Sequence, residues 1–383
     1  MLNVLTGSAF AENPTRAVEE LHAAVVHPAL SAAFLFTSAG YDLSELGEAI
    51  AARFTCPVIG AVVPGSILSG RGYTMSGIVG AGIVSDRLRA CPILVPSIST
   101  FNASTAVTLA RRALAECGEL APDESRFAML LIDAQSCAEE IVTASLHHAF
   151  GGIHLFGGSV GTDFLDNQGF VYHDGRFHED AALLTLFRTS LPYAIFQTQH
   201  YRATGRTLVV TDADPATRTV RCFNGRPAGD VYAEALDVPV ESLGADDFSK
   251  HPLLLHIGNR DFVRAAIGLN LDRSLQFSCA VEVGTELAVG RAEDLLERLR
   301  AELAELEGEM PSGKLLVLCD CLHRRSEIAQ DGLFAEVAKV LATYTHIGLS
   351  TYGEQLDGLH LNQTLTGLLL GGGAVGGAAA SID

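Results

Sequence analysis

The feature of this sequence that most restricts its fold is an internal repeat. Residues 33–82 and residues 315–372 lie about 280 positions apart and follow the same order of predicted elements. Each copy opens on a short apolar run, Ala33–Phe36 in the first and Leu315–Leu318 in the second. Runs of this length, followed by a polar turn, are typical of buried strands. A repeated strand–helix–strand unit predicts two related domains, each with an α/β core.

Each copy continues with a predicted amphipathic helix and a glycine turn. In the first copy, Asp42 is placed to cap the helix, and Glu45 follows three residues later as a capping box requires. Each helix leads to a second strand and to a turn that ends on Gly65 or Gly353. Apolar residues recur at helical spacing in both copies: Leu43, Leu46, Ile50 and Phe54 in the first, and Leu333, Val337, Val340, Leu341 and Tyr344 in the second.

The segment between the two copies is predicted to be rich in strands. Residues 193–198, 207–211 and 219–223 are apolar or β-branched runs separated by turn sequences. A helix is expected from about Val231, and residues 293–307 show the leucine spacing of an amphipathic helix. The prediction as a whole is an α/β fold with mixed sheets, in which the duplicated units flank a strand-rich insertion.

A glycine-rich segment, residues 151–161, is the expected boundary between domains. We therefore expect an N-terminal domain over residues 1–160. The C-terminal domain would cover residues 161–383 and would contain the strand-rich insertion.

Charge and composition exclude several classes of protein. The formal charge of −19 argues against nucleic acid or an anionic membrane as a partner, because both need a basic surface. Eight cysteines are too few for a disulfide scaffold of this length, so reduced thiols are expected. The N-terminus does not resemble a signal peptide, and polar residues and glycines interrupt the uncharged segment 361–382. The expectation is a cytoplasmic protein.

A Gly-x-Ser-x-Gly string centred on Ser159 is the pattern of a hydrolase nucleophile. In hydrolases this serine stands on a turn between a strand and a helix, but no helical period follows Ser159. The preferred interpretation is therefore a glycine-rich turn, with a serine hydrolase as a weak rival. No phosphate-binding Gly-x-x-x-x-Gly-Lys-Ser/Thr string is present.

Cys319, Cys321 and His323 form the densest group of soft metal ligands. Zinc or iron would need a further ligand, such as Cys279 or His360, to complete the site. The simpler interpretation is a pair of buried thiols next to an exposed histidine, so the metal site is carried as an alternative.

His200 follows a buried apolar run and has Phe196 and Tyr201 beside it. A histidine that ends a buried strand among aromatic residues satisfies the needs of an axial haem ligand, which are a neutral imidazole and apolar walls. From the residues alone, His200 is one candidate among several histidines.

Polar residues also gather at the glycine turn of the second copy. Tyr352, Glu354 and Gln355 stand on one side of this turn, and His360 and Asn362 stand on the other. Such a group is either a fully hydrogen-bonded corner or the wall of a polar pocket. Both interpretations stay open at this stage.

At these positions the sequence resembles a known family. Ser350–Gln355, followed by His360-Leu361-Asn362-Gln363-Thr364, resembles the C-terminal signature of FIST-domain sensory proteins. Cys321 and Arg324 match the short Cys-x-x-Arg stretch of that family, and Phe156–Ser159 matches the end of its N-terminal domain. The resemblance extends from about residue 20 to residue 372 and implies two related FIST domains.

The sequence is most similar to one branch, the nitric-oxide-sensing haem proteins called NosP. This branch shares Thr198-Gln199-His200 followed by an aromatic residue, Leu208–Pro215, and Asn224–Ala228. The resemblance implies a bacterial sensor that holds haem b, with His200 as the proximal ligand, and binds nitric oxide at the iron. It would regulate a partner, either a histidine kinase or a cyclic-di-GMP enzyme (a diguanylate cyclase or phosphodiesterase), and would not itself be an enzyme.

A FIST sensor without haem is the alternative. It would bind a small metabolite such as an amino acid. The family usually carries Cys-Thr-Thr and Ala-Gly-Glu at its N-terminal glycine turn, whereas this chain has Ala61–Ser66 there, which favours a site in the C-terminal copy. A homodimer is left open. The residues expected to hold the metabolite are Arg324, Tyr352, Glu354, Gln355, His360 and Asn362.

Overall fold

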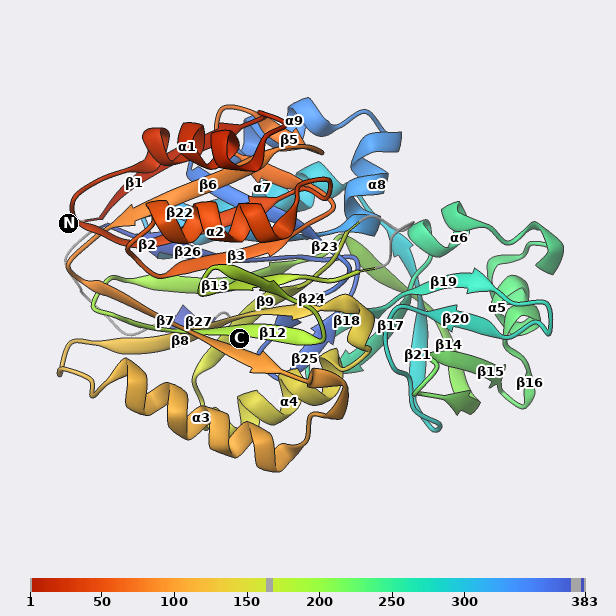
Figure 1. The fold of residues 1–383 in the computed structure, drawn as a ribbon. Helices are drawn as coiled ribbons and strands as arrows, with labels where there is room; N and C mark the ends of the chain where they lie inside the picture. The colour runs from red at the N-terminus through yellow and green to blue at the C-terminus, as the bar shows by residue number, and fades with distance from the viewer. Residues whose placement is uncertain (1, 163–167, 373–379, 382–383) are drawn as a thin grey trace.

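The computed structural model describes residues 2–162, 168–372 and 380–381 and confirms a mixed α/β fold (Figure 1). A large body of sheets, with helices on its outside, carries a smaller strand-rich lobe at one end. The described residues of the body form three copies of one unit, where the sequence predicted two.

The first unit shows the plan of all three. Its strand β2 (Leu30–Thr37) pairs in parallel with β3 (Val58–Val62) and antiparallel with β6 (Ile78–Val84). Helix α2 (Leu43–Arg53) connects the two parallel strands. The unit also contains β1 (Asn3–Ala9), α1 (Pro14–Val25) and the hairpin of β4 (Ser66–Leu68) and β5 (Gly72–Thr74).

The same pairing occurs twice more. In the second unit, β8 is parallel to β9 and antiparallel to β12. In the third, β22 is parallel to β23 and antiparallel to β26. The second unit consists of β7 (Leu88–Pro96), α3 (Ala103–Cys117), β8 (Ser125–Asp133), α4 (Glu139–Phe150), β9 (His154–Val160), β10 (Val171–His173), β11 (Arg176–His178) and β12 (Ala181–Thr189). The third consists of β13 (Tyr193–Thr198), α7 (Leu295–Glu309), β22 (Gly313–Cys321), α8 (Leu322–Gln330), α9 (Phe334–Leu341), β23 (Thr345–Thr351), β24 (Glu354–Leu356), β25 (Leu359–Leu361) and β26 (Leu365–Gly371).

Each unit passes its hairpin to the sheet of another unit, and the three exchanges close a ring. Strand β4 of the first unit pairs with β23 of the third. Strand β24 of the third pairs with β9 of the second, and β10 of the second pairs with β3 of the first. Because every sheet is completed by a strand from another unit, the three units form one folding body with a shared core.

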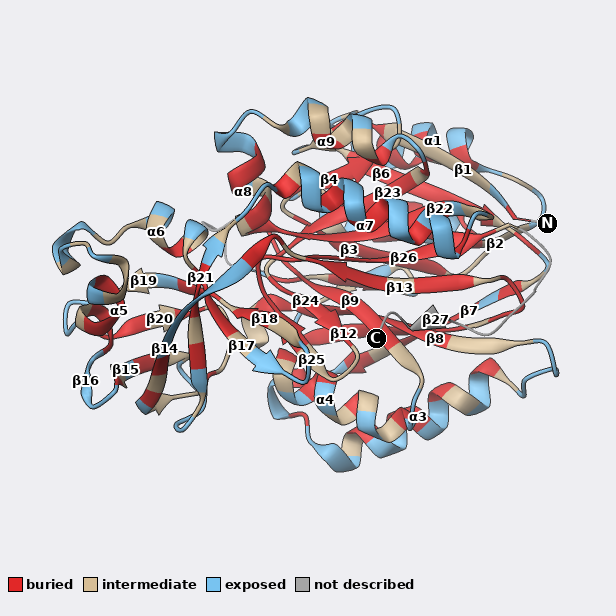
Figure 2. Ribbon diagram, turned by 180° about the vertical axis from the view of Figure 1, so that it is seen from behind, coloured by how far each residue is buried: buried red, intermediate tan, exposed pale blue. Residues whose placement is uncertain are grey.

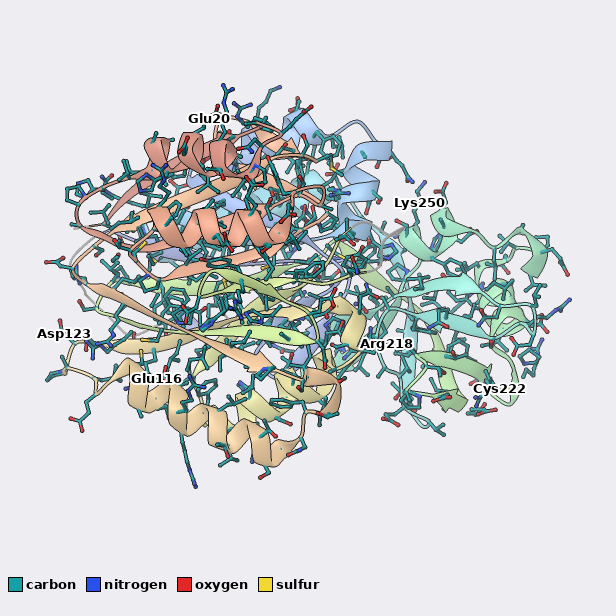
Figure 3. All side chains as sticks on the ribbon, in the orientation of Figure 1. Glu20, Glu116, Asp123, Arg218, Cys222 and Lys250 are labelled. Carbon is teal, nitrogen blue, oxygen red and sulfur yellow. The ribbon has the colours of Figure 1, made fainter. Side chains whose placement is uncertain are left out.

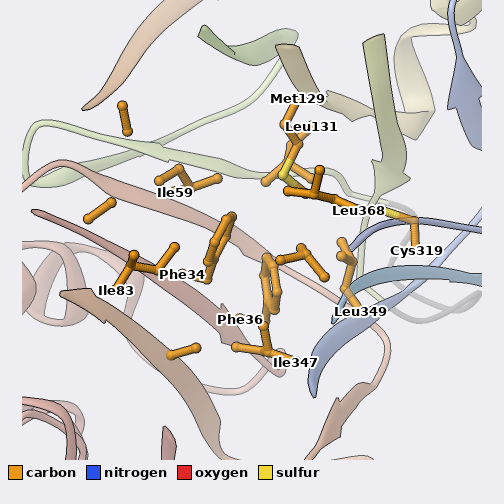
Figure 4. Packing of buried hydrophobic residues seen from close by; sticks show 14 of the residues in the cluster. Phe34, Phe36, Ile59, Ile83, Met129, Leu131, Cys319, Ile347, Leu349 and Leu368 are labelled. Atoms are coloured by element: carbon orange, nitrogen blue, oxygen red, sulfur yellow. The ribbon is translucent and has the colours of Figure 1, made fainter. Parts of the chain in front are cut away.

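That core lies where the three sheets face one another. Phe34, Phe127, Phe187 and Val317 belong to one buried cluster that draws on all three units. Figure 4 shows part of it, and Figure 2 shows the sheets as the most buried layer of the body. The helices cover the outer faces, with α1 and α2 on the first sheet, α3 and α4 on the second, and α7 and α9 on the third. Strands covered on both faces explain the continuous apolar runs in the sequence.

The helix predicted in the first copy is confirmed, but its capping box is only half formed. The Asp42 side chain accepts a hydrogen bond from the Glu45 backbone N–H at 2.9 Å. The Glu45 carboxylate does not return to Asp42. It accepts hydrogen bonds from Asn13 Nδ2 at 3.2 Å and Thr15 Oγ1 at 2.9 Å, and so joins α2 to the start of α1.

In the second copy, the sequence predicted one helix and the structure has two. Helix α9 covers most of the predicted positions, but α8 was missed. Its buried face includes Arg324 and Glu327 as well as Ile328, so its sequence shows little apolar periodicity.

The glycine-rich segment 151–161, the expected boundary, contains a strand. Residues 154–160 form β9, a buried strand in the middle of the second sheet. Its glycines allow close packing, because a Cβ on Gly157 would lie 1.9 Å from the Leu130 carbonyl oxygen. The division expected between residues 160 and 161 falls at the end of this strand.

The lobe is the predicted strand-rich insertion. It lies between β13 and α7 in the chain and extends from one end of the body (Figure 1). The predicted strands 193–198 and 219–223 are confirmed as β13 and β15, and 207–211 lies within the longer β14. The lobe contains β14 (Tyr201–Asp214), β15 (Thr219–Phe223), β16 (Arg226–Pro227), α5 (Ala228–Leu236), α6 (Ala245–Lys250), β17 (Leu253–Ile257), β18 (Arg260–Arg264), β19 (Ala266–Leu269), β20 (Leu275–Phe277) and β21 (Glu286–Ala292).

The uncharged C-terminal segment was expected to form a final buried strand followed by a tail. The strand is β26, which lies next to β22. Most of the tail lies outside the described residues. Among the helices of the described ranges, none combines the length and the apolar character needed to cross a membrane.

Candidate functional site

The predicted polar residues of the third unit gather at one end of the body. They lie at the carboxyl ends of the parallel strands β22 and β23, the edge where α/β sheets usually bind ligands. The hairpin of β24 and β25 covers this edge and pairs with β9 of the second unit. The buried polar side chains here are Ser159, Asp320, Arg324, Ser350, Thr351, Glu354, Gln355, His360, Asn362, Gln363 and Thr364.

Glu354 is a fully buried carboxyl group of this cluster. Its oxygens accept hydrogen bonds from Thr351 Oγ1 at 2.6 Å, Thr364 Oγ1 at 2.5 Å and the Thr364 backbone N–H at 3.1 Å. Burial nevertheless dominates and raises the pKa of Glu354 to about 8, while the hydroxyl groups work in the opposite direction. Glu354 is therefore mostly protonated at neutral pH.

Arg324 is already paired. Its Nη1 donates a hydrogen bond to Asp320 Oδ1 at 2.6 Å, and both side chains are buried. The other Asp320 oxygen accepts a hydrogen bond from Tyr73 OH at 2.6 Å. Since Tyr73 belongs to the hairpin of the first unit, this network joins two units at the site.

Gln355 and His360 hold buried atoms that the surrounding protein does not satisfy. Gln355 Nε2 donates to Ser159 Oγ at 2.9 Å and lies 3.3 Å from His360 Nδ1. Gln355 Oε1 and His360 Nε2 have no hydrogen-bond partner among the described residues. Buried polar atoms rarely stay unpaired, so water or a ligand is expected there.

The remaining predicted ligand residues have structural contacts. Asn362 Nδ2 donates to the Leu361 carbonyl oxygen at 2.9 Å, and its Oδ1 lies 3.4 Å from the Ala265 backbone nitrogen in the lobe. Tyr352 OH donates to the Thr162 carbonyl oxygen at 2.7 Å. The two interpretations of this turn are therefore both partly correct, because it is a hydrogen-bonded corner that retains unpaired atoms.

His200 lies where the chain crosses from the body into the lobe. Its side chain is buried, and its Nε2 lies 2.9 Å from Glu327 Oε1 of α8. Its backbone carbonyl accepts a hydrogen bond from the Glu293 N–H at 2.7 Å, at the point where the chain returns from the lobe. One residue thus connects both crossing segments to α8.

The two aromatic neighbours of His200 have different surroundings. The ring of Tyr201 lies 4.3 Å from the imidazole between centroids, and its hydroxyl lies 3.4 Å from Glu327 Oε2. Burial raises the pKa of Tyr201 well above its usual value of 10.0. Phe196 instead packs with leucines of α7 in a different cluster from that of Tyr201.

The donor set around His200 fits an axial haem ligand. A histidine that binds a metal usually holds a carboxylate or carbonyl with its other ring nitrogen, as His200 does with Glu327. If haem bound here, Nδ1 would be the ring nitrogen available to hold the iron, and the ring of Tyr201 would lie beside it.

The cysteine group is less suited to a metal. Cys319 packs in the central core, and Cys321 Sγ accepts a hydrogen bond from the Gln363 N–H at 3.2 Å. His323 is beyond the strand, on α8, and burial lowers its pKa. Within the ranges that the structure describes, no group of three or more His, Cys, Asp or Glu side chains is arranged to hold a metal ion.

Ser159 was interpreted as part of a glycine turn, and this was wrong. It is a fully buried residue of β9, whose backbone N–H donates to the Gly353 carbonyl oxygen at 2.8 Å. The side-chain oxygen accepts the hydrogen bond from Gln355. A strand position of this kind does not provide the exposed turn that a hydrolase nucleophile needs.

Several important residues were not identified from the sequence. Arg324 was named from the sequence, but its ion pair with Asp320 was not, although the spacing of four residues could have suggested it. Glu327 and Tyr73 have no local signal, because their partners lie far away in the chain.

Ion pairs between the body and the lobe were also missed. Arg218 of the lobe contacts Glu139 at 2.6 Å and Glu140 at 3.0 Å at the start of α4, where Figure 3 labels it at the junction. Arg264 Nη1 donates to the His360 carbonyl oxygen at 2.7 Å. The lobe therefore contacts the hairpin that carries the unpaired atoms.

Comparison with known families gives two matches. The model of the FIST N domain matches residues 31–226, just over half of the chain. The model of the FIST C domain matches residues 228–357. A comparison with curated protein sequences gives no match.

Proposed function

The chain belongs to the FIST family, whose domains suggest a role in sensory signal transduction, and on this premise we propose that it is a haem-b sensor of nitric oxide. It acts by binding and regulates a partner signalling protein. The observation that carries the proposal is the buried pair of His200 and Glu327 at the junction of body and lobe. The sequence resemblance to NosP proteins supports the same assignment.

His200 would hold the haem, and Glu327 would orient the imidazole. When bound, the haem iron supplies the coordination position that nitric oxide takes. The part played by the chain itself follows from the contacts of His200, which joins the outgoing segment, the returning segment at Glu293 and helix α8. A change in the hydrogen bonds of this residue would alter the position of the lobe, and so the surface offered to a partner.

The test is a haem titration of the purified apoprotein, followed by nitric oxide added to the reduced form. We expect a sharp Soret band that saturates near one equivalent and shifts with the gas. His200→Ala should abolish the saturable band. Glu327→Gln should keep the one-to-one stoichiometry and weaken affinity by about 10- to 100-fold, the usual effect of losing such a partner.

His346→Gln is the matched control, because His346 is a buried histidine of β23 that contacts Ser69 and lies outside this junction. It should bind haem like the wild type. Full haem content and an unchanged Soret band in His200→Ala would overturn the ligand assignment. A band that never saturates in the wild type would overturn the haem proposal itself.

A second candidate is a haem-free sensor of a small polar metabolite such as an amino acid. The unpaired Gln355 Oε1 and His360 Nε2 favour it, since a ligand could supply both missing hydrogen bonds. Arg324 is engaged by Asp320 and is therefore not available to hold a ligand carboxylate. An amino-acid panel tested by thermal shift, with Gln355→Leu as the negative control, would support this candidate if haem fails to bind.

The expected partner is a histidine kinase or a cyclic-di-GMP enzyme. The regulatory test is to mix the purified sensor with such a partner and to measure kinase or cyclase activity with and without nitric oxide. A gas-dependent change that disappears with His200→Ala would link the lobe junction to output. Activity that is the same in all samples would exclude that partner.

A further inference from the structure

Two thiols outside the candidate site lie close together. Cys91 is on β7, and Cys117 is the last residue of α3. Cys91 Sγ lies 4.0 Å from the carbonyl oxygen of Glu116, the residue that precedes Cys117. Cys117 Sγ donates a hydrogen bond to the Leu186 carbonyl oxygen, 3.8 Å away, and Leu186 is opposite Cys91 in the sheet.

The two thiols differ in access to solvent. Cys91 is 8% exposed and lines an open surface groove of about 550 Å³, together with Ser31, Pro57 and Arg89. Its strand β7 is the edge of the second sheet. Cys117 is fully buried behind it. A small reagent would therefore reach Cys91 first and Cys117 only through Cys91.

The charges around the pair favour a thiolate at Cys91. The hydrogen bond from Cys117 is the largest cause that lowers the pKa of Cys91 to about 6, and Arg89 and Arg188 act in the same direction. The same contact raises the pKa of Cys117, which keeps its proton. The nearest carboxylates are engaged elsewhere, Glu116 by Arg112 at 2.6 Å and Glu124 by Arg188 at 3.3 Å.

We propose that Cys91 and Cys117 are a redox-active dithiol that peroxides oxidise to a disulfide. The sulfur of Cys91 attacks one peroxide oxygen, so that an S–O bond forms, the O–O bond breaks and the other oxygen leaves as water after taking a proton. The sulfur of Cys117 then loses its proton and attacks Cys91, an S–S bond forms, and the sulfenic oxygen leaves as water. Two thiols lose two electrons in all, and hydrogen peroxide becomes two waters.

This site is separate from the polar cluster of the third unit. The groove is lined by Ser31 and Pro57, which lie at the amino ends of β2 and β3. The polar cluster lies at the carboxyl ends of the equivalent strands in the third unit. The disulfide would connect the edge strand of the second sheet to the end of α3, and so would add an oxidant input to the sensor.

The other cysteines provide matched controls. Cys56 also lines an open groove, but burial raises its pKa to about 11. Cys137 is exposed, and burial of its sulfur raises its pKa. If access alone decided reactivity, these two thiols would react before Cys91. If the thiolate decides it, Cys91 would react first.

The experiment treats the full chain with a small excess of hydrogen peroxide and maps its peptides by mass spectrometry. We expect a Cys91–Cys117 disulfide, with Cys56 and Cys137 still reduced. In Cys117→Ser, a dimedone adduct should form at Cys91, since the resolving thiol is absent. A disulfide-free wild type with peroxide damage at Cys56 or Cys137 would overturn the proposal.

A second measurement uses the wild-type protein, so its main result does not depend on whether a cysteine variant folds. The rate of iodoacetamide labelling at each cysteine of the wild type is followed against pH. Labelling of Cys91 should rise through a midpoint below the ordinary thiol value of 9.0 and be at least ~10-fold faster at pH 7 than that of Cys56, whose pKa is raised. A Cys91 rate that rises only above pH 8 would refute the dithiol. Cys117→Ala should move the midpoint upward, because the largest cause of the low pKa is removed.

Discussion

Replacing Glu354 with glutamine should make the protein more stable at neutral and alkaline pH. Glutamine keeps the shape of the protonated acid, and its oxygen can still accept the Thr364 backbone hydrogen bond. It cannot ionise. Because the wild-type carboxyl group is fully buried, its ionisation opposes folding.

The sign follows from the direction of the pKa change. The pKa of Glu354 rises from an ordinary 4.5 to about 8 in the folded protein. Below pH 4.5 the Glu354 carboxyl group is neutral in both the folded and the unfolded state, so it does not lower the free energy of unfolding. As the pH rises from 4.5 to 8, the unfolded chain loses the proton and the folded chain keeps it, so stability falls.

The magnitude follows from about 1.4 kcal/mol for each unit of pKa difference. Relative to pH 4, the wild type should lose about 3 kcal/mol by pH 7 and about 5 kcal/mol by pH 9 from this group alone. Other groups titrate in the same range, so the useful quantity is the difference between wild type and Glu354→Gln. At pH 4 the free energies of unfolding of the two proteins should differ by no more than about 1 kcal/mol. The advantage of the variant should then grow by about 3 kcal/mol by pH 7 and about 5 kcal/mol by pH 9.

The assay is urea unfolding at pH 4, 7 and 9, followed by circular dichroism. Thr364→Val should enlarge the pH dependence, because its hydroxyl stabilises the carboxylate. Thr366→Val is the control on the same strand, since its hydroxyl contacts the Gly157 carbonyl oxygen instead. A difference between wild type and Glu354→Gln that stays constant from pH 4 to 9 would refute the argument.

Three further changes test the fold. Asp42→Ala should cost about 1 kcal/mol in urea unfolding, the usual effect of losing an N-cap, and an unchanged midpoint would contradict the cap. Arg218→Met should cost about 3–5 kcal/mol, because it leaves the buried Glu139 carboxylate without its partner. It should also speed trypsin cleavage between body and lobe, and equal cleavage rates would argue against this contact. Gly157→Ala should prevent soluble expression, because the added Cβ would meet the Leu130 carbonyl oxygen at 1.9 Å; a folded variant would disprove that packing.

The local elements of this protein were largely predictable from its sequence. The cap at Asp42, the leucine stripe of α7 and the boundaries of β13 and β15 depend on short windows of chain. Periodicity and capping act within a few residues, so they can be identified without knowledge of the fold. The polar residues around Glu354 could also be identified, because they lie within one turn.

The middle unit could not be identified in the same way. Its strand β9 contains Gly157 and Gly158, which predicted a turn. These glycines are required by a neighbour from elsewhere, since the side chain of Thr351 and the backbone of Leu130 approach them too closely for a Cβ. Glycines that a distant contact requires within a strand therefore look like turn residues when the sequence is considered locally.

By itself, the sequence determined the repeated strand–helix–strand unit, the mixed α/β class and the separate strand-rich insertion. Only the tertiary structure decided that the units number three in the described residues, that they exchange hairpins, and which side chains meet. His200 meets Glu327 and Tyr73 meets Asp320 across different elements. The physical reason is that hydrophobic periodicity selects which face of an element is buried, whereas the partner on that face depends on strand register around the closed ring.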